Sequence, residues 1–201
     1  MGKLCLNWCT LKEGYCVKIF VYSASLRENS VNLKLSTLIA KVAEAHGAEV
    51  DFARINDFDM PFYNFDAQQS DGLPAGTVAL ADRIKSADGM ILTSPEYNWL
   101  PPASIKNAMD WLSRIKPGPL DKKSILLSSA SPSLAGGVKG LMTLRISFEA
   151  LGTWVYPRMF TLAQAPTAFK DDGTLVNDDL TVMLNNMVAD YCSAAVALSN
   201  R

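Results

Sequence analysis

Apolar and polar positions along the chain follow two patterns, one typical of strands and the other of helices. Residues 17–22 are rich in β-branched and aromatic side chains and predict a strand. After Ser30, apolar residues from Leu35 to Val42 recur at the spacing of one helix face, and Gly47 ends the pattern. This segment therefore predicts an amphipathic helix with a serine N-cap and a glycine at its end.

The alternation of strands and helices continues to the end of the chain. Further strands are predicted at residues 49–53, 90–92, 124–128 and 154–156. Further helices are predicted at about 74–86, after Pro101 and Pro102, after Gly136 and Gly137, and from Asp178 to about residue 198. Residues 55–74 carry no periodic pattern, and a connection of that length indicates a loop with a function.

Strands that alternate with helices at short spacing indicate parallel β-α-β units with helices on both faces of the sheet. Right-handed crossovers leave few topologies for five such units. The sequence thus predicts an α/β fold, a flavodoxin-like three-layer α/β/α sandwich whose five-stranded parallel sheet has the order 2-1-3-4-5. We expect residues 15–201 to form this single domain and residues 1–14 to be an extension outside it.

Composition excludes several classes of function. Of the 201 residues, 49% are hydrophobic and 19% charged, which is typical of a globular protein and not of a disordered chain. A formal net charge of −1 disfavours nucleic acid as a partner, and the pattern contains no apolar run long enough to span a membrane. The four cysteines and one histidine form no metal-binding pattern, so we expect no metal and a cytoplasmic location.

In the predicted topology, ligands bind beyond the carboxyl ends of the strands, where the first and third strands flank a crevice. The loop at residues 23–32 concentrates hydroxyl groups, one arginine and one asparagine at the start of a helix. Free backbone N–H groups and the helix dipole favour an anion such as phosphate there. A capped helix with a few surface serines is an equally good interpretation of this segment alone.

Two further loops complete the expected site. Residues 93–102 combine tyrosine, tryptophan, asparagine and proline, which offer flat apolar surface beside amide groups, although aromatic loops more often pack locally. Residues 129–137 end in two glycines that let the backbone approach a ligand or simply form a tight turn. A phosphate site at one end and a clamp for a flat ring at the other describe a mononucleotide, and FMN fits best.

Several segments also carry a resemblance to a known family. They are residues 24–27 with Ser30 and Asn32, residues 61–66 (PFYNFD), residues 94–98 (SPEYN), residues 106–111 (KNAMDW), residues 130–132 with the glycine pair, and residues 144–145. These segments are similar to motifs of the NADPH-dependent FMN reductase family, and the resemblance extends over about residues 17–195. The block from SPEYN to KNAMDW is its most specific part.

The resemblance implies roles for individual residues. The FMN phosphate would be held by Ser25, Arg27, Ser30 and Asn32. The isoalloxazine ring would be lined by Pro95, Glu96, Tyr97 and Asn98 and closed on its other side by Ser131, Gly136 and Gly137. Two departures are Ala24, where glycine is usual, and Trp99, which would narrow the space over the ring.

The resemblance also implies an activity. The chain would pass a hydride from NADPH or NADH to flavin N5 and on to a quinone, azo or metal-oxyanion acceptor, with no catalytic side chain. A homodimer or homotetramer is expected, with the aromatic residues 62–65 reaching towards a neighbour. The alternatives are an FMN reductase that supplies reduced flavin to a monooxygenase, or a flavodoxin-type electron carrier, which the low net charge disfavours.

Overall fold

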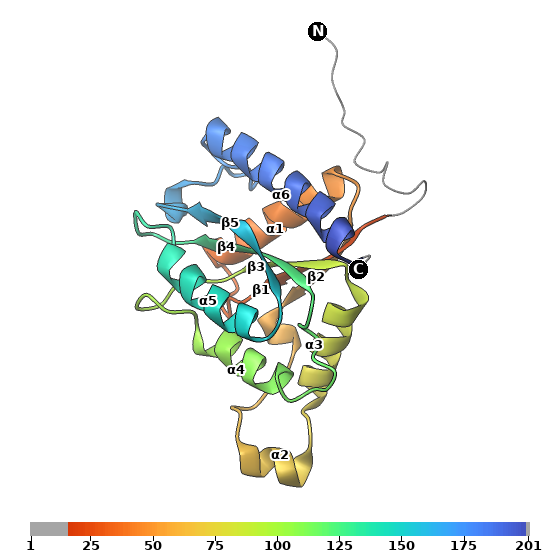
Figure 1. The fold of residues 1–201 in the computed structure, drawn as a ribbon. Coiled ribbons are helices and arrows are strands. Elements are labelled where there is room, and N and C mark those ends of the chain that lie inside the picture. Colours follow the sequence, from red (N-terminus) through yellow and green to blue (C-terminus); the bar gives the residue numbers. More distant parts are fainter. Residues whose placement is uncertain (1–15, 200–201) are drawn as a thin grey trace.

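In the computed structural model, which describes residues 16–199, helices cover both faces of a central sheet (Figure 1). The strands are β1 (Lys18–Ser23), β2 (Glu49–Arg54), β3 (Gly89–Thr93), β4 (Ser124–Ala130) and β5 (Trp154–Leu162). The helices are α1 (Val31–Ala45), α2 (Phe65–Asp71), α3 (Ala75–Ser86), α4 (Ala103–Leu112), α5 (Val138–Ala150) and α6 (Asp178–Ser199), with short 3₁₀ turns at Ile55–Asp57 and Ala165–Thr167. The predicted extension at residues 1–14 lies outside the described residues.

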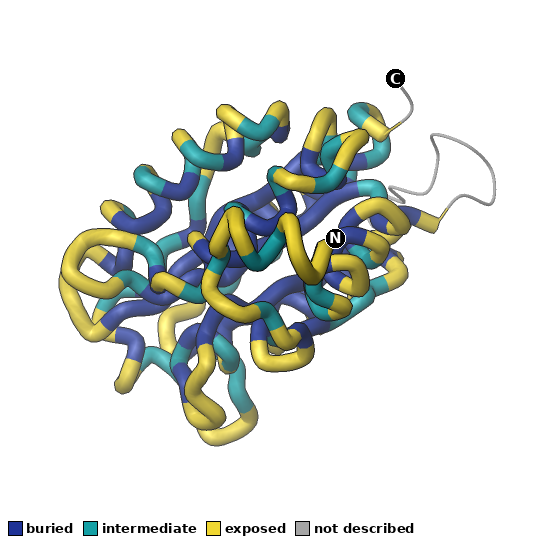
Figure 2. The backbone as a smooth tube through the Cα atoms, turned by 90° about the horizontal axis from the view of Figure 1, so that it is seen from below, coloured by how far each residue is buried: buried dark blue, intermediate teal, exposed yellow. Residues whose placement is uncertain are grey.

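All strand pairs in the sheet are parallel, and the strand order is β2-β1-β3-β4-β5. This confirms the order predicted from the sequence. The central strands β3 and β4 are buried along their whole length, because helices cover them on both faces. Figure 2 shows the same arrangement, with buried strands inside and exposed residues on the outer loops and helix surfaces.

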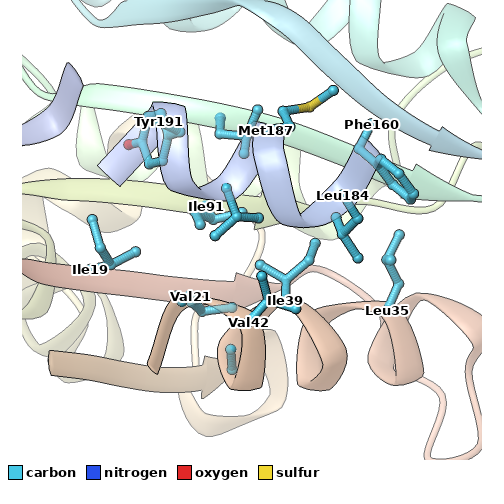
Figure 3. Packing of buried hydrophobic residues seen from close by; sticks show 14 of the residues in the cluster. Ile19, Val21, Leu35, Ile39, Val42, Ile91, Phe160, Leu184, Met187 and Tyr191 are labelled. Carbon is cyan, nitrogen blue, oxygen red and sulfur yellow. The ribbon is translucent and has the colours of Figure 1, made fainter. Parts of the chain in front are cut away.

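Successive residues of β1 point to opposite faces and so contribute to two separate cores. Val21 belongs to one core with residues of α1 and α6, and Ile39 and Val42 of α1 lie beside it (Figure 3). Phe20 points to the other face and packs with residues of α3, α4 and α5. Burying a side chain the size of Leu35 stabilises the fold by about 2 kcal/mol.

The hydroxyl group of Tyr191 fastens α6 to the sheet. It accepts a hydrogen bond from the Met90 amide (2.8 Å) and donates one to the Ser124 carbonyl (3.0 Å). A Cβ atom on Gly89 would lie 2.6 Å from this hydroxyl, so only glycine fits there without a shift of the helix. Within residues 16–199, no helix combines the length and the apolar character that crossing a bilayer requires.

Two segments differ from the prediction. Residues 55–74 are not one irregular loop, because they contain a 3₁₀ turn and the short helix α2, which buries none of its residues. Strand β5 continues past residue 156 to Leu162. It passes through Pro157, which an edge strand tolerates, and the pairing of β4 with β5 shifts register between Ile125 and Leu127.

Candidate active site

Backbone hydrogen bonds bring three loops to the same edge of the sheet. The Ala24 amide donates to the Thr93 carbonyl, and the Ser94 amide donates to the Ser128 carbonyl, each at 2.9 Å. The loops after β1, β3 and β4 therefore leave the sheet side by side, at its carboxyl edge. These are the three loops in which the sequence placed the site.

The first loop holds a buried hydroxyl group that has no partner. Ser25 is 1% exposed, and its Oγ forms no hydrogen bond with any described residue. Leaving such a group unpaired costs about 1–3 kcal/mol, so its position before the start of α1 indicates a ligand. Ser30 follows as the N-cap of α1, and its Oγ accepts from the Asn32 amide at 3.1 Å.

The two arginines nearest this loop are used differently. Arg54 forms a bidentate ion pair with Glu28, at 2.8 and 3.2 Å, which fixes the tip of the loop to the end of β2. Arg27 is exposed, and its guanidinium takes part in no hydrogen bond or ion pair within the described residues. Arg27 is thus the cation of this loop that is available to an anionic ligand.

Asn32 links the first loop to the third. Its side-chain amide donates to the Ala130 carbonyl and accepts from the Ala130 amide, both at 2.8 Å. This buried pair of bonds fixes the start of α1 against the end of β4. The family resemblance implies that Asn32 holds the FMN phosphate, whereas the contacts that the structure gives its side chain are with the protein.

The second loop ends in a tight two-residue turn. The amides and carbonyls of Tyr97 and Leu100 exchange hydrogen bonds of 2.8 and 3.0 Å. The residues between them, Asn98 and Trp99, have φ angles of 51° and 68°, which is the conformation of a type I′ turn. The Tyr97 side chain is half exposed at this edge, as a surface for a flat ring requires.

Glu96 joins the second loop to α5. Its Oε2 accepts a hydrogen bond of 2.8 Å from the Gly140 amide in the first turn of the helix. A carboxylate is favoured there, because the helix N-terminus carries partial positive charge. A Cβ atom on Gly140 would lie 3.3 Å from Glu96 Cβ, so the loop and the helix are in direct contact.

The glycine pair of the third loop is required by its surroundings. Gly136 and Gly137 have φ angles of 62° and 87°. A Cβ atom on Gly137 would lie 2.1 Å from Ser129 Oγ, a buried hydroxyl that also has no hydrogen-bond partner among the described residues. The Ser131 hydroxyl is used locally, since it accepts from the Ser133 amide at 3.2 Å.

These features fit a flavin mononucleotide. The unpaired Ser25 hydroxyl, the start of α1 and Arg27 provide donors for a phosphate. Tyr97 and the glycine-bearing third loop lie beyond the ends of β3 and β4, where a planar ring extending from that phosphate would reach.

A cavity of about 480 Å³ lies at the opposite edge of the sheet, between the ends of α4 and α5, with Lys116 and Asp121 in its wall.

Asn107 and Trp111 have a role that the sequence did not suggest. The Asn107 side chain accepts from the Tyr63 amide (2.8 Å) and donates to the Pro61 carbonyl (3.0 Å). Trp111 Nε1 donates to the same carbonyl at 2.7 Å, and its ring meets Tyr63 edge to face at 5.0 Å. The two motifs PFYNFD and KNAMDW therefore bind each other, which a sequence pattern cannot reveal.

Other polar groups lie away from the three loops. His46 is the C-cap of α1, and Cys16 and Cys192 are free thiols. Among the described residues, no three side chains of the metal-binding types gather at one place.

Comparisons with known proteins identify the family. A sequence profile of the NADPH-dependent FMN reductases matches residues 17–167. The chain belongs to the NADPH-dependent FMN reductase family. It is accordingly an FMN-dependent oxidoreductase that uses NAD(P)H, and the family resemblance predicted from the sequence is confirmed.

Individual relatives of this FMN reductase agree with that assignment. A quinone reductase of Escherichia coli (strain K12) is 38% identical over 129 residues, which are 64% of this chain and 68% of the relative. An NAD(P)H-dependent FMN reductase of Pseudomonas aeruginosa is 30% identical over 166 residues, covering 81% and 86% of the two chains.

Comparison with solved structures identifies the fold. The flavoenzyme NAD(P)H:(acceptor) oxidoreductase of Paracoccus denitrificans superposes with a TM-score of 0.76 at 27% identity, over 90% of this chain and 97% of that one. A flavodoxin of Bacillus cereus, 16% identical, superposes with a TM-score of 0.55 over 87% of this chain and 96% of that one. The predicted flavodoxin-like fold is therefore confirmed.

Proposed function

We propose that this FMN reductase binds FMN across the three loops and transfers electrons from NAD(P)H to a quinone. The observation that carries the proposal is the buried, unpaired Ser25 hydroxyl at the point where the loops after β1, β3 and β4 converge. A relative named as a quinone reductase supports the choice of acceptor.

The residues have distinct tasks in this proposal. Ser25 and Arg27 bind the phosphate, while Ser30 caps α1 and so fixes the direction of the amides that face the anion. Asn32 holds this group against the end of β4. It is a positioning residue in our proposal, and Ser25 and Arg27 are the ligands.

The ring occupies the space between the second and third loops. Pro95, Tyr97 and Asn98 line one side of it, and Glu96 keeps their loop against α5 through the Gly140 amide. On the other side the third loop closes the space with Ser131, Gly136 and Gly137. The Ser131 and Gly136 amides donate to the carbonyls of Leu162 and Ser133, at 3.0 and 3.2 Å, so the Gly137 amide is the one that would stabilise negative charge at the ring edge.

FMN bound in these loops would supply the two-electron redox chemistry that connects NAD(P)H to the acceptor. The overall reaction is NAD(P)H + H⁺ + quinone → NAD(P)⁺ + hydroquinone. The protein itself binds and orients the flavin and excludes water from it. It uses no side-chain nucleophile.

A spectroscopic titration tests this function. The purified protein should bind FMN with a shifted visible absorption band, and anaerobic NADPH or NADH should bleach it. Menadione should then restore the colour. Flavin that binds but is not bleached by either nucleotide would contradict the reductase function, and bleaching without reoxidation by menadione would contradict the quinone as acceptor.

We also propose that the protein is a homodimer, or a tetramer of dimers, held in part by residues 62–65. Phe62 is 79% exposed and Phe65 59%, and α2 extends away from the body of the domain (Figure 1). Exposed aromatic residues at the tip of a well-anchored segment are typical of an interface. Sedimentation of the wild type and of Phe62→Ser tests this: we expect a dimer that dissociates in the variant, and a monomeric wild type would contradict it.

The cellular compartment is part of the proposal. NAD(P)H is supplied inside the cell, and Cys16 and Cys192 are free thiols, which a reducing cytoplasm maintains. Fractionation of cells that produce the protein should place it in the cytoplasm.

A further inference from the structure

The turn after β3 holds Trp99 in a backbone conformation that bulky side chains avoid. Its φ of 68° occupies the second central position of a type I′ turn, where glycine is the usual residue. Tryptophan at this position destabilises the turn relative to glycine. Strain of this kind persists at sites where a side chain serves binding or catalysis.

The Trp99 side chain contributes little to the packing of the fold. It is 66% exposed, and its indole lies outside both hydrophobic cores. The contact that the structure gives it is with Lys139, whose Nζ lies 3.1 Å from the ring centroid. An ammonium group above an indole is attracted by the electron-rich face of the ring.

Lys139 is placed where a cation does not stabilise its own helix. It lies in the first turn of α5, whose positive dipole end disfavours a lysine. The carboxylate of Glu96 binds the next amide, that of Gly140, and Lys139 takes part in none of the ion pairs within residues 16–199. A positive charge without a carboxylate partner among the described residues thus stands against an exposed flat ring, on the loop that carries Tyr97 and Asn98.

We propose that Trp99 and Lys139 form the docking site for the electron acceptor and select flat aromatic acceptors that carry a negative charge. This inference rests on the reductase function proposed above. Lys139 Nζ covers one face of the Trp99 indole, so the acceptor ring lies beside the indole and its anionic substituent pairs with this Nζ. Strain in the turn and a cation at the wrong end of a helix then have one common explanation, the binding of such an acceptor.

Two naphthoquinones of similar size test the charge selection. Lawsone is an anion at neutral pH, and menadione is neutral. In the FMN-loaded enzyme, Lys139→Met should lower kcat/KM for lawsone about fivefold, the effect of losing one exposed ion pair, and leave that for menadione unchanged. Lys41→Met, which removes an exposed lysine from the outer side of α1, is the matched control and should change neither value.

A binding measurement tests the same site without turnover. Naphthalenesulfonate is flat and anionic and accepts no hydride. Calorimetry should show that it binds the FMN-loaded wild type, about fivefold more weakly after Lys139→Met, and more weakly still after Trp99→Gly. The Trp99→Gly protein should also melt at a higher temperature than the wild type, because glycine fits the turn.

The outcomes separate this inference from the proposed function. If the wild type fails to oxidise NADPH with menadione, the proposed function is wrong and the docking site falls with it. If the wild type reduces both quinones and Lys139→Met changes neither their ratio nor sulfonate binding, the docking site alone is wrong. If Lys139→Met raises the KM for NADPH and changes nothing else, Lys139 binds the nucleotide, and this result would also overturn the inference.

Discussion

Gly137 and Gly173 share a backbone conformation but not an environment. Their φ angles are 87° and 82°, yet a Cβ atom on Gly137 would lie 2.1 Å from Ser129 Oγ, whereas one on Gly173 would meet nothing within 4 Å. The cost of the backbone conformation and the cost of the steric clash are therefore separable within one chain.

Alanine at these two positions should destabilise the protein to different degrees. We expect about 1 kcal/mol for Gly173→Ala, from the backbone alone. For Gly137→Ala we expect at least about 2 kcal/mol, together with weaker FMN binding, because the third loop must shift. Urea unfolding and flavin titration measure the two effects. Equal destabilisation by both substitutions would contradict the clash.

Ser25 and Asn32 should respond in opposite ways to alanine. Ser25→Ala removes a buried hydroxyl without a partner, so the free energy of unfolding without flavin should rise by about 1 kcal/mol, while FMN affinity falls about tenfold. Asn32→Ala leaves the buried amide and carbonyl of Ala130 unpaired and should cost about 2 kcal/mol without flavin. A large loss of stability in Ser25→Ala would show that its hydroxyl has a structural partner.

The difference between Ser25 and Asn32 shows how much of the site can be predicted from the sequence. The spacing of the motifs places Ser25 and Asn32 together at the start of a helix, but it does not tell which of them the protein itself uses. That depends on Ala130, a residue without a functional group of its own, nearly a hundred positions away. The contact of Lys139 with Trp99 was equally out of reach, since it joins a loop to a helix forty residues further along the chain.

At the scale of elements, the segment from Met60 to α2 is held by few but specific contacts. Asn107 binds three backbone groups of this segment, and α2 itself buries no residue. The segment is therefore fixed at its base and exposed beyond it.

Loss of the Asn107 amide should free this segment without unfolding the domain. In Asn107→Leu, which keeps the volume, amides of residues 60–72 should exchange with solvent at least tenfold faster, while those of β3 and β4 stay protected. Hydrogen exchange followed by mass spectrometry measures both. Lys106→Met on the exposed side of the same helix is the control. Unchanged exchange in residues 60–72 would mean that other contacts hold the segment.

The elements themselves were predictable wherever they bury a face. Helices such as α1 and α4 show their apolar stripe in the sequence, because that stripe packs on the sheet. Helix α2 has no such stripe and was missed, and the length of β5 was underestimated because Pro157 interrupts its pattern. Pairing with β4 in the folded sheet determines how far β5 extends.

At the scale of the whole molecule, buried phenol groups lie on both faces of the sheet. Tyr22 belongs to the core under α3 to α5, and Tyr191 to the core under α1 and α6. Burial raises the pKa of both tyrosines above 10.0, with a smaller contribution from the charge of Asp57 at Tyr22. Both remain protonated in the folded state when the unfolded chain begins to ionise.

The fold should therefore lose stability in alkali. Below pH 10 the two tyrosines are protonated in both states and have no effect; above it the unfolded chain releases protons that the folded chain keeps. Each tyrosine then lowers the free energy of unfolding by about 1.4 kcal/mol per pH unit. Tyr22→Phe, which removes a hydroxyl without a partner, should reduce the slope by that amount at little cost at pH 8. Urea titrations between pH 8 and 11 measure the slope, and an unchanged slope would show that Tyr22 ionises while folded.

The bond pair between Asn32 and Ala130 also limits where this edge tolerates additional residues. An insertion between Ser30 and Asn32, or one that lengthens β4 before Ala130, would separate the two partners. An insertion at the exposed tip around Leu134 would leave them in place. Directed evolution of new acceptor preferences should therefore accumulate length changes at that tip and only point substitutions beside the phosphate.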